Sequence, residues 1–274
     1  MLLRCGPHDF VLDRPLIMGI LNVTPDSFSD GGMHASTDAA IRHARTLISE
    51  GADIVDIGGE STRPGAQPVS LEEERARILP VLEALSREIP VSVDTRKPLL
   101  MREAIAAGAA MINDISALET PGALEAVAAT GVGVCLMHKQ GEPHTMQHEP
   151  RYGDVVREVK DYLAGRVAAA RAAGIAADHI VVDPGFGFGK TYEHNLMLLR
   201  GLEELTKLRV AVLAGLSRKA TIGRITGREP QDRVHGSVAA ALIAVQNGAH
   251  VVRVHDVAAT KDALAVWMAV TRHG

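Results

Sequence analysis

The sequence predicts an α/β fold in which eight parallel strands, each followed by helix, close into a single-domain TIM barrel. The first observation is that short apolar runs alternate with longer segments that have the amphipathic pattern of helices. The second is that these runs are apolar throughout, as in parallel strands covered on both faces. The third is the length of 274 residues, which suits eight such units. The runs are residues 16–21, 54–57, 91–93, 110–112, 132–137, 180–182, 210–213 and 251–254.

The competing architecture is a doubly wound open sheet, which also alternates strands with helices. The sequence shows no change of composition that would mark a second domain. We therefore assign residues 15–274 to one barrel domain and residues 1–14 to a short N-terminal strand or hairpin extension. Within this extension, we expect residues 10–12 to form a small strand that plugs the bottom of the barrel.

Residues typical of helix ends indicate where two of the helices begin and end. Ser36 or Thr37 is a candidate N-cap for the helix after the first strand, and Gly51 suits the positive φ at its end. Ser70 and Glu73 have the spacing of a capping box, which satisfies free backbone N–H groups at a helix start. A second helix is therefore expected to begin directly after Ser70.

Composition argues against several classes of function. The formal net charge is −4 and the pI is near 6.3, whereas nucleic-acid-binding proteins usually carry a basic excess. Aromatic residues make up only 3%, which is few for base-stacking platforms. No apolar run is long enough to span a bilayer, and two cysteines cannot build a disulfide framework. We therefore expect a cytoplasmic protein without nucleic-acid or membrane partners.

Each predicted strand is followed by a polar residue at its carboxyl end, where TIM barrels carry their active sites. A single such residue can be explained as a cap or turn, because Asp and Asn are common where strands meet loops. Polar residues at all eight ends would be costly to bury without partners, so we interpret them as one site. They are Asn22, Asp56, Asp94, Asn113, His138, Asp183, Lys219, Arg253 and His255.

The residue types at these ends predict a ligand that combines a planar heterocycle with a phosphorylated group. Carboxylates and amides can pair with the edge of an amino-pyrimidinone ring, and the candidates are Asp94, Asn113 and Asp183. Cationic and imidazole groups bind phosphate or carboxylate oxygens, and the candidates are Arg63, Lys219, Arg253 and His255. Asn22 offers a neutral oxygen that suits Mg²⁺.

A glycine-rich stretch at residues 185–191 is similar to a phosphate-binding loop but fails on spacing. Pro184 occupies the position at which the phosphate-loop pattern requires its first glycine. We interpret the stretch as a tight active-site loop that brings Phe188 over a ligand.

Three further features have simpler interpretations. His138, His144 and His148 suggest zinc, but no Cys or acidic residue completes a familiar ligand set, so a surface loop is favoured. Cys135 lies in the middle of a strand and is expected to be a small buried hydrophobic residue. Asp56 is interpreted as a structural partner for loop backbone.

Two long segments resemble the signatures of the bacterial dihydropteroate synthases, a family that binds pterins. Residues 18–32 (MGILNVTPDSFSDGG) resemble the first signature, and residues 57–65 (IGGESTRPG) resemble the second. Shorter matches follow in family order at residues 92–95, 113–115, 137–141, 183–188, 217–219 and 253–256. The resemblance extends over residues 15–270, and signatures of this length are highly specific.

The resemblance implies a Mg²⁺-dependent transferase of folate biosynthesis. Its reaction joins 6-hydroxymethyl-7,8-dihydropterin diphosphate to p-aminobenzoate and releases pyrophosphate and 7,8-dihydropteroate. An SN1-like mechanism is implied, with loops at residues 22–33 and 58–69 that close over the substrates and exclude water. Sulfonamides are expected to compete with p-aminobenzoate, and a homodimer is expected.

The resemblance also assigns roles to the residues that match family motifs. The catalytic set comprises Arg63, Asp94, Asp183, Lys219, Arg253 and His255. The pterin contacts are Asp94, Asn113, Asp183 and Lys219, in a pocket lined by Ile115, Met137 and Phe188. The contacts to diphosphate and Mg²⁺ are Asn22, Arg63, Arg253 and His255, with Asn22 as the metal ligand. The walls around p-aminobenzoate are Phe28, Thr62, Pro64 and Ser217.

Two alternatives share part of this pattern. A methyltetrahydrofolate-binding methyltransferase domain would use the same pterin contacts, but it does not need the two loop motifs that this chain has. A non-catalytic pterin-binding paralogue predicts damage in the loops or at Arg253 and His255, and both residues are intact. Departures from the family at Arg96 and Lys139 leave the required groups in place and bear only on substrate affinity.

Overall fold

The closed barrel is present in the computed structural model, which describes residues 1–24, 32–61, 68–141, 146 and 150–271, with the backbone alone for 32–35. Its parallel strands pair in the order β10-β3-β4-β5-β6-β7-β8-β9, and the last closes on the first. They are β3 (Leu16–Asn22), β4 (Ile54–Gly58), β5 (Val91–Asp94), β6 (Met111–Asp114), β7 (Gly133–Met137), β8 (Ile180–Asp183), β9 (Ala211–Ala214) and β10 (Val251–Val254). The TIM barrel is confirmed, and the open doubly wound sheet is excluded.

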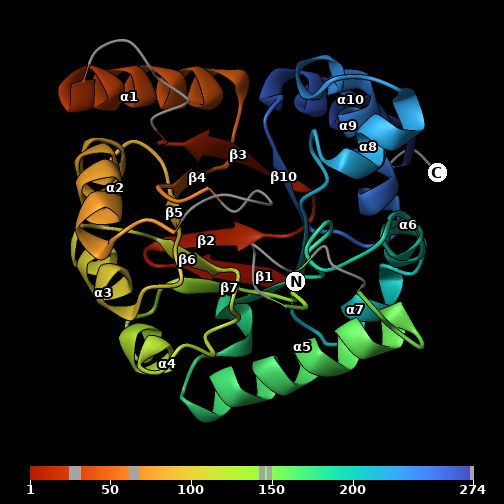
Figure 1. Ribbon diagram of the computed structural model, residues 1–274, viewed down its shortest axis with the longest axis horizontal. Coiled ribbons are helices and arrows are strands. Elements are labelled where there is room, and N and C mark those ends of the chain that lie inside the picture. The colour runs from red at the N-terminus through yellow and green to blue at the C-terminus, as the bar shows by residue number, and fades with distance from the viewer. Residues whose placement is uncertain (25–31, 62–67, 142–145, 147–149, 272–274) are drawn as a thin grey trace.

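Helices surround this barrel as an outer ring (Figure 1). They are α1 (Gly32–Glu50), α2 (Leu71–Leu85), α3 (Pro98–Ala106), α4 (Ala123–Val127), α5 (Val155–Ala172), α6 (Tyr192–Arg200), α7 (Glu203–Thr206), α8 (Ala220–Thr226), α9 (Val234–Gln246) and α10 (Val257–Thr271). The connections after β8 and after β9 each hold two of them. None of the helices in the described ranges is long and apolar enough to cross a bilayer.

The aliphatic core has two layers, one on each face of the barrel sheet. Ile17 and Leu21 of β3 belong to the outer layer, which packs against the helices. Met18 belongs to the inner layer, which fills the barrel together with Met111 and Cys135. Because successive side chains of a strand point to opposite faces, both faces of each run must be apolar. The prediction that Cys135 is buried is confirmed, since it is fully buried.

The first helix starts earlier than its predicted cap. Ser36 and Thr37 lie inside α1, so the prediction that one of them is the N-cap is wrong. The preceding residues 33–35 are compatible with helix, and a capping preference does not stop a helix that its neighbours allow to continue. The end of α1 was predicted correctly, because Gly51 follows it with a φ of +103°.

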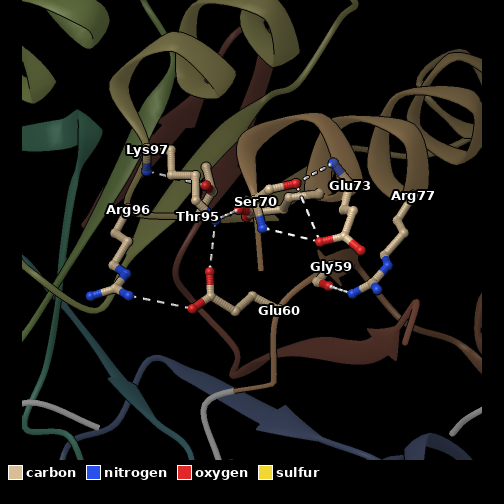
Figure 2. Close-up of polar contacts among 9 residues, drawn as sticks. Gly59, Glu60, Ser70, Glu73, Arg77, Thr95, Arg96 and Lys97 are labelled. Atoms are coloured by element: carbon tan, nitrogen blue, oxygen red, sulfur yellow. Dashed lines mark hydrogen bonds and ion pairs between the residues drawn. The ribbon is translucent and has the colours of Figure 1, made fainter. Parts of the chain in front are cut away.

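The capping box of α2 is confirmed. Ser70 Oγ accepts a hydrogen bond from the Glu73 N–H at 3.2 Å, and the Glu73 carboxylate accepts one from the Ser70 N–H at 3.2 Å. Figure 2 shows this pair close to the connection that follows β4. The cap thereby fixes where the chain enters α2 after passing the carboxyl end of the barrel.

The N-terminal extension forms a hairpin with two strands. β1 (Leu2–Cys5) pairs antiparallel with β2 (His8–Val11), and the pair lies at the centre of the ring of strands in Figure 1. Leu3 and Cys5 are fully buried among the residues that fill the barrel. A Cβ added to Gly133 would lie 2.9 Å from Cys5 Sγ, so the hairpin closes the amino-terminal end tightly. The predicted strand at 10–12 is therefore part of a plug whose innermost side chains come from β1.

Candidate active site

Polar side chains meet at the carboxyl end of the barrel, opposite the hairpin. The strand register places Gly58 between Asn22 and Asp94, and it places Asn113 beside Asp94. A Cβ at Gly58 would lie 3.9 Å from Asn22 Oδ1 and 3.7 Å from the Asp94 Cβ. Because Gly58 has no side chain, Asn22 and Asp94 lie close together above the end of β4.

A second glycine opens the other side of this end. A Cβ added to Gly215, directly after β9, would lie 3.9 Å from each of Asp183 Oδ2, Lys219 Nζ and the Arg253 Cβ. These three side chains therefore surround one point above β9. The described residues that were predicted to form one site lie far apart in the sequence, and they converge on one end of the barrel.

Arg253 is held between two carboxylates. Its Nε donates to Asp56 Oδ2 at 2.6 Å, and its Nη2 donates to Asp94 Oδ2 at 3.1 Å. The Asn113 amide also donates to Asp56 Oδ2, at 3.2 Å. Asp56 is fully buried, so its interpretation as a partner for loop backbone is wrong. A carboxylate without water must find a cation, and Arg253 is the cation within reach.

These contacts change the ionisation of the pair. Burial and repulsion from Asp56 raise the pKa of Asp94 to about 7, despite the nearby guanidinium of Arg253. Burial disfavours the charged form of Arg253, but Asp56 and Asp94 outweigh this effect and raise its pKa further. Arg253 is therefore a permanent cation, whereas Asp94 can gain or lose a proton near neutral pH.

Asp183 and Lys219 form the second charged pair of the site. Asp183 is 6% exposed, and its Oδ1 accepts a hydrogen bond from the Gly185 N–H at 2.7 Å. Lys219 Nζ donates to the Phe186 carbonyl at 2.6 Å and lies 4.8 Å from the centre of the Phe188 ring. Burial raises the pKa of Asp183 and lowers that of Lys219 to about 8, although each group favours the charge of the other.

The loops after β9 and β10 are joined by hydrogen bonds. Ser217 Oγ lies 3.0 Å from His255 Nδ1 and accepts a hydrogen bond from the His255 N–H at 3.1 Å. The guanidinium of Arg218 pairs with Asp256 at 2.5 and 3.1 Å. These contacts hold Ser217 beside His255, which follows Arg253 by two residues in the chain, at the carboxyl end of the barrel.

The remaining predicted site residues fall into two groups. Ile115 and Met137 are buried, 6% and 4% exposed, at the ends of β6 and β7. Four predicted residues lie outside the described part of the chain, as do His144, His148 and residues 25–31 and 62–67 of the two predicted closing loops; they are Phe28, Thr62, Arg63 and Pro64. The structure therefore does not bear on their predicted roles.

The prediction of a surface loop at His138 is wrong. His138 is 6% exposed, and its Nδ1 lies 2.9 Å from the buried amine of Lys190. Burial and this neighbouring amine lower the pKa of His138 to about 3. Burial likewise lowers the pKa of Lys190 to about 7. Lys190 was not among the predicted site residues, although it ends the glycine-rich stretch that was predicted to be an active-site loop, because only Phe188 of that loop was expected to meet a ligand.

Ion pairs beside the site were also missed. Lys97 Nζ contacts the buried Glu74 and donates to Glu60 Oε2 at 2.8 Å, and Arg96 reaches Glu60 Oε1 at 3.4 Å (Figure 2). Arg77 donates to the Gly59 carbonyl at 2.8 Å. The segment Gly59–Glu60, which continues β4, is thereby tied to the start of α3 and to α2. A charged residue inside a family motif, as at Glu60, was the available signal.

The oxygen donors at the carboxyl end of the barrel suit a metal ion that needs few protein ligands. Within the described ranges, no group of three His, Cys, Asp or Glu side chains could hold a metal ion. Asn22 and Asp94 nevertheless offer oxygens on either side of Gly58, and both are partly exposed. Mg²⁺ commonly keeps several waters and is held by one or two protein oxygens together with substrate phosphates. This donor set therefore fits a Mg²⁺ ion whose coordination a diphosphate completes.

Comparison with known proteins gives consistent matches over the barrel. A family model described as "Pterin binding enzyme" matches residues 18–255. The dihydropteroate synthase of Escherichia coli strain K12 is 52% identical over 257 residues, which cover 93% of this chain and 91% of that protein. The Xanthomonas albilineans dihydropteroate synthase with 4-aminobenzoic acid has a TM-score of 0.93 and 56% identity, with 98% of each chain covered. The Burkholderia cenocepacia enzyme complexed with 7,8-dihydropteroate has a TM-score of 0.91 and 52% identity, with 99% of this chain and 97% of that chain covered.

Proposed function

Because the chain belongs to the dihydropteroate synthase family of pterin-binding enzymes, we propose that it joins 6-hydroxymethyl-7,8-dihydropterin diphosphate to p-aminobenzoate. The products are 7,8-dihydropteroate and pyrophosphate. The Xanthomonas relative binds 4-aminobenzoic acid and the Burkholderia relative binds 7,8-dihydropteroate, which are a substrate and the product of this reaction. The chain is thus a transferase of folate biosynthesis.

The observation that carries this proposal is the meeting of buried carboxylates and cations above two glycines. A pterin presents ring N–H and amino donors on one edge and a carbonyl beside them. We assign the donors of this edge to the acceptors of Asp183 and Asn113, and the carbonyl to Lys219. Apolar surface for the flat ring would come from Ile115, Met137 and Phe188.

The proposed reaction is dissociative. The bond between the pterin methylene carbon and the diphosphate oxygen breaks first, and its electron pair leaves with pyrophosphate. The carbocation is delocalised over the pterin ring, and the carboxylates of Asp94 and Asp183 stabilise its charge. The aniline nitrogen of p-aminobenzoate then attacks the methylene carbon and loses one proton, which is released with the pyrophosphate. The protein supplies charge, orientation and exclusion of water rather than a nucleophile.

The leaving group requires positive charge at the mouth of the barrel. We assign the diphosphate to Arg63, Arg253 and His255. Arg253 uses Nε and Nη2 for its two carboxylates, which leaves Nη1 for a phosphate oxygen. Asn22 would hold Mg²⁺, which when bound supplies further positive charge at the diphosphate.

The site for p-aminobenzoate is assigned by family resemblance to four residues. They are Phe28, Thr62, Pro64 and Ser217. Ser217 is 5% exposed and lies beside His255, so this wall would adjoin the diphosphate site. Sulfonamides, which are similar in shape and charge to p-aminobenzoate, should compete for it.

The two alternatives gain no support from these observations. The three named relatives are synthases that match over nearly their whole length, and none of them is a methyltransferase. Arg253 and His255, which a paralogue without activity could lose, are both present at the site. We therefore retain the synthase alone.

A coupled assay of pyrophosphate release tests the proposal. With both substrates and Mg²⁺, we expect equal amounts of pyrophosphate and 7,8-dihydropteroate, and a sulfonamide should raise the KM for p-aminobenzoate. Addition of EDTA should stop both products. Absence of dihydropteroate in the complete mixture would contradict the proposed function, whereas unchanged turnover in EDTA would contradict only the role of Mg²⁺.

We also propose a homodimer and a cytoplasmic location. Large apolar side chains are exposed on the neighbouring helices α8, α9 and α10, a pattern typical of an interface; they are Ile225, Ile243, Val266 and Val270. Light scattering should then give twice the 29.1 kDa of one chain, and a monomeric mass would contradict the dimer.

The proposed cytoplasmic location rests on the cysteines. Cys5 and Cys135 are buried free thiols, which suits the reducing cytoplasm.

A further inference from the structure

The loop after β8, residues 184–190, is fixed at successive backbone positions by side chains. The Gly185 N–H donates to Asp183 at 2.7 Å, and the Phe186 carbonyl accepts from Lys219 at 2.6 Å. The Gly187 N–H donates to Asn195 at 2.7 Å. The Phe188 carbonyl accepts from Lys190 at 3.0 Å, and the Gly189 carbonyl accepts from Tyr152 at 2.8 Å. Five successive residues of a loop without regular secondary structure are thereby each fixed by a side-chain hydrogen bond.

Two glycines allow this loop to touch the chain that leaves β7. Gly185 and Gly189 have φ values of +66° and +60°. A Cβ at Gly185 would lie 1.9 Å from the His138 carbonyl oxygen, and one at Gly189 would lie 2.2 Å from the Gln140 carbonyl oxygen. No larger residue fits at either position, so the two backbones pack directly against each other.

Lys190 joins these two segments from the inside. It is 3% exposed, and its amine lies 2.9 Å from His138 Nδ1, 3.0 Å from the Phe188 carbonyl and 3.4 Å from the His138 carbonyl. These three acceptors match the three N–H groups of a lysine ammonium. When Lys190 is an ammonium, His138 Nδ1 can only accept from it, so the neutral ring of His138 then carries its proton on Nε2. Burial lowers the pKa of this amine to about 7, although the carboxylate of Asp183 favours its charge. Burying an amine among uncharged acceptors is costly, which argues for a purpose other than stability.

We propose that Lys190, with His138 as its acceptor, is a positioning residue that sets the pterin-binding loop. This inference rests on the proposed function, because it takes Phe188 and Lys219 to be pterin contacts. Lys190 holds the carbonyl of Phe188 itself, and it holds the loop whose Phe186 carbonyl anchors Lys219. Without the ammonium, both contacts would lose their fixed places, although Lys190 itself is not among the residues assigned to the substrate.

The test is kinetic and uses Lys190→Met, which keeps the chain length of the side chain and removes the buried charge. We expect the KM for the pterin diphosphate to rise about tenfold, while the KM for p-aminobenzoate changes less than about twofold. The melting temperature, measured in parallel, should change by only a few degrees, because the acceptors lose their donor while the cost of burying the amine is removed. Lys160→Met, which removes a partly buried lysine paired with Glu204, is the matched control and should leave both KM values unchanged.

A double-mutant cycle tests the pairing with His138. If Lys190 acts through this acceptor, the effects of Lys190→Met and His138→Phe on the KM for the pterin diphosphate should not multiply. The double variant should then show the same KM as Lys190→Met. Multiplying effects would overturn the pairing. An unchanged pterin KM in an active Lys190→Met protein would overturn the positioning role.

Amide hydrogen exchange tests the same role without any activity. In Lys190→Met, the amides of Gly187 and Phe188 should exchange about tenfold faster or more, compared with the wild type and with Lys160→Met. Equal exchange in all three proteins would contradict the inference. If the wild type made no dihydropteroate, the proposed function would fail, and the exchange rates would still decide whether Lys190 holds the loop.

Discussion

Arg253 lies between Asp56 and Asp94, so that two carboxylates share one guanidinium in a site with little water. The fully buried Asp56 makes the shorter contact, and Asp94 is left with the weaker one. Burial and repulsion from Asp56 raise the pKa of Asp94 to about 7, and the attraction of Arg253 does not offset them. The negative charge of Asp94 is therefore unfavourable in the free protein, and it becomes favourable when positive charge develops on the bound pterin.

Asp94→Asn should therefore stabilise the folded chain while it impairs catalysis. Asp94 ionises near pH 4 in the unfolded chain but only at about pH 7 when folded, so the folded state loses stability as the pH rises through this window. Asn does not ionise, and its free energy of unfolding should be about 1–2 kcal/mol higher than that of the wild type above pH 7. Urea denaturation at several pH values measures the difference.

The difference in stability between Asp94→Asn and the wild type should shrink as the pH falls from 7 and disappear below pH 4, where Asp94 is protonated in both the unfolded and the folded chain. The kcat/KM of Asp94→Asn should fall at least about tenfold, because the pterin carbocation would lose the nearby negative charge of Asp94. A constant stability difference across the pH range would show that Asp94 is not ionised in this window.

Asp183→Asn should lower kcat/KM by about 100-fold or more, as measured by steady-state pyrophosphate release. One carboxylate oxygen of Asp183 already accepts the Gly185 N–H, so an Asn at 183 would keep its oxygen there and turn its NH₂ group toward the donors of the pterin. Asp161→Asn, an exposed change on α5, is the control. Kinetics close to those of the wild type would remove Asp183 from the pterin site.

The connections after β4 and β5 lie side by side and are linked by charge. Lys97, at the N-cap of α3, contacts Glu74 in the first turns of α2 and Glu60 after β4. Glu74 is 1% exposed, so this lysine neutralises a carboxylate that water cannot reach. The arrangement relates α2, α3 and the end of β4 to one another at the rim of the site (Figure 2).

Lys97→Met should destabilise the protein by about 2–4 kcal/mol, because the buried Glu74 would keep its charge without a partner. This loss of stability is smaller than for a fully buried ion pair, since the Lys97 side chain is 23% exposed. Urea denaturation measures it. Adding Glu74→Gln should recover most of the loss, and Lys207→Met, which removes an exposed pair with Glu204, should change stability by less than about 0.5 kcal/mol. Loss without recovery would mean that Lys97 acts by packing alone.

The barrel strands could be predicted from sequence because both of their faces are covered, which leaves an apolar run. The N-terminal hairpin extension was predicted correctly, but the bounds of β1 were not, since its four residues alternate and only Leu3 and Cys5 face the core. Asp56 was identified at a strand end, but its partner is Arg253, 197 positions away, and no local pattern reports such a pair. Contacts between distant segments decide which polar residues are structural and which are free for a ligand.

Seen as a whole, the molecule separates stability from chemistry along the barrel axis. The hairpin closes the amino-terminal end with apolar side chains, and the charged residues lie at the carboxyl end. TIM barrels in general carry their active sites at the latter end, whereas the former contributes to stability. A change in the hairpin should therefore affect folding and leave the kinetic constants alone.

Leu3→Ala tests this separation. Leu3 is fully buried among the side chains that fill the barrel, and its truncation leaves a cavity that should lower the free energy of unfolding by about 2–4 kcal/mol. At a temperature where the variant remains folded, its kcat/KM should lie within about twofold of the wild type. Val11→Ala, on the same hairpin at a side chain that is 64% exposed, should change neither quantity. A Leu3→Ala protein that kept its stability but lost activity would show that the hairpin is coupled to the site through the barrel interior, and the two ends would then have to be treated as one unit.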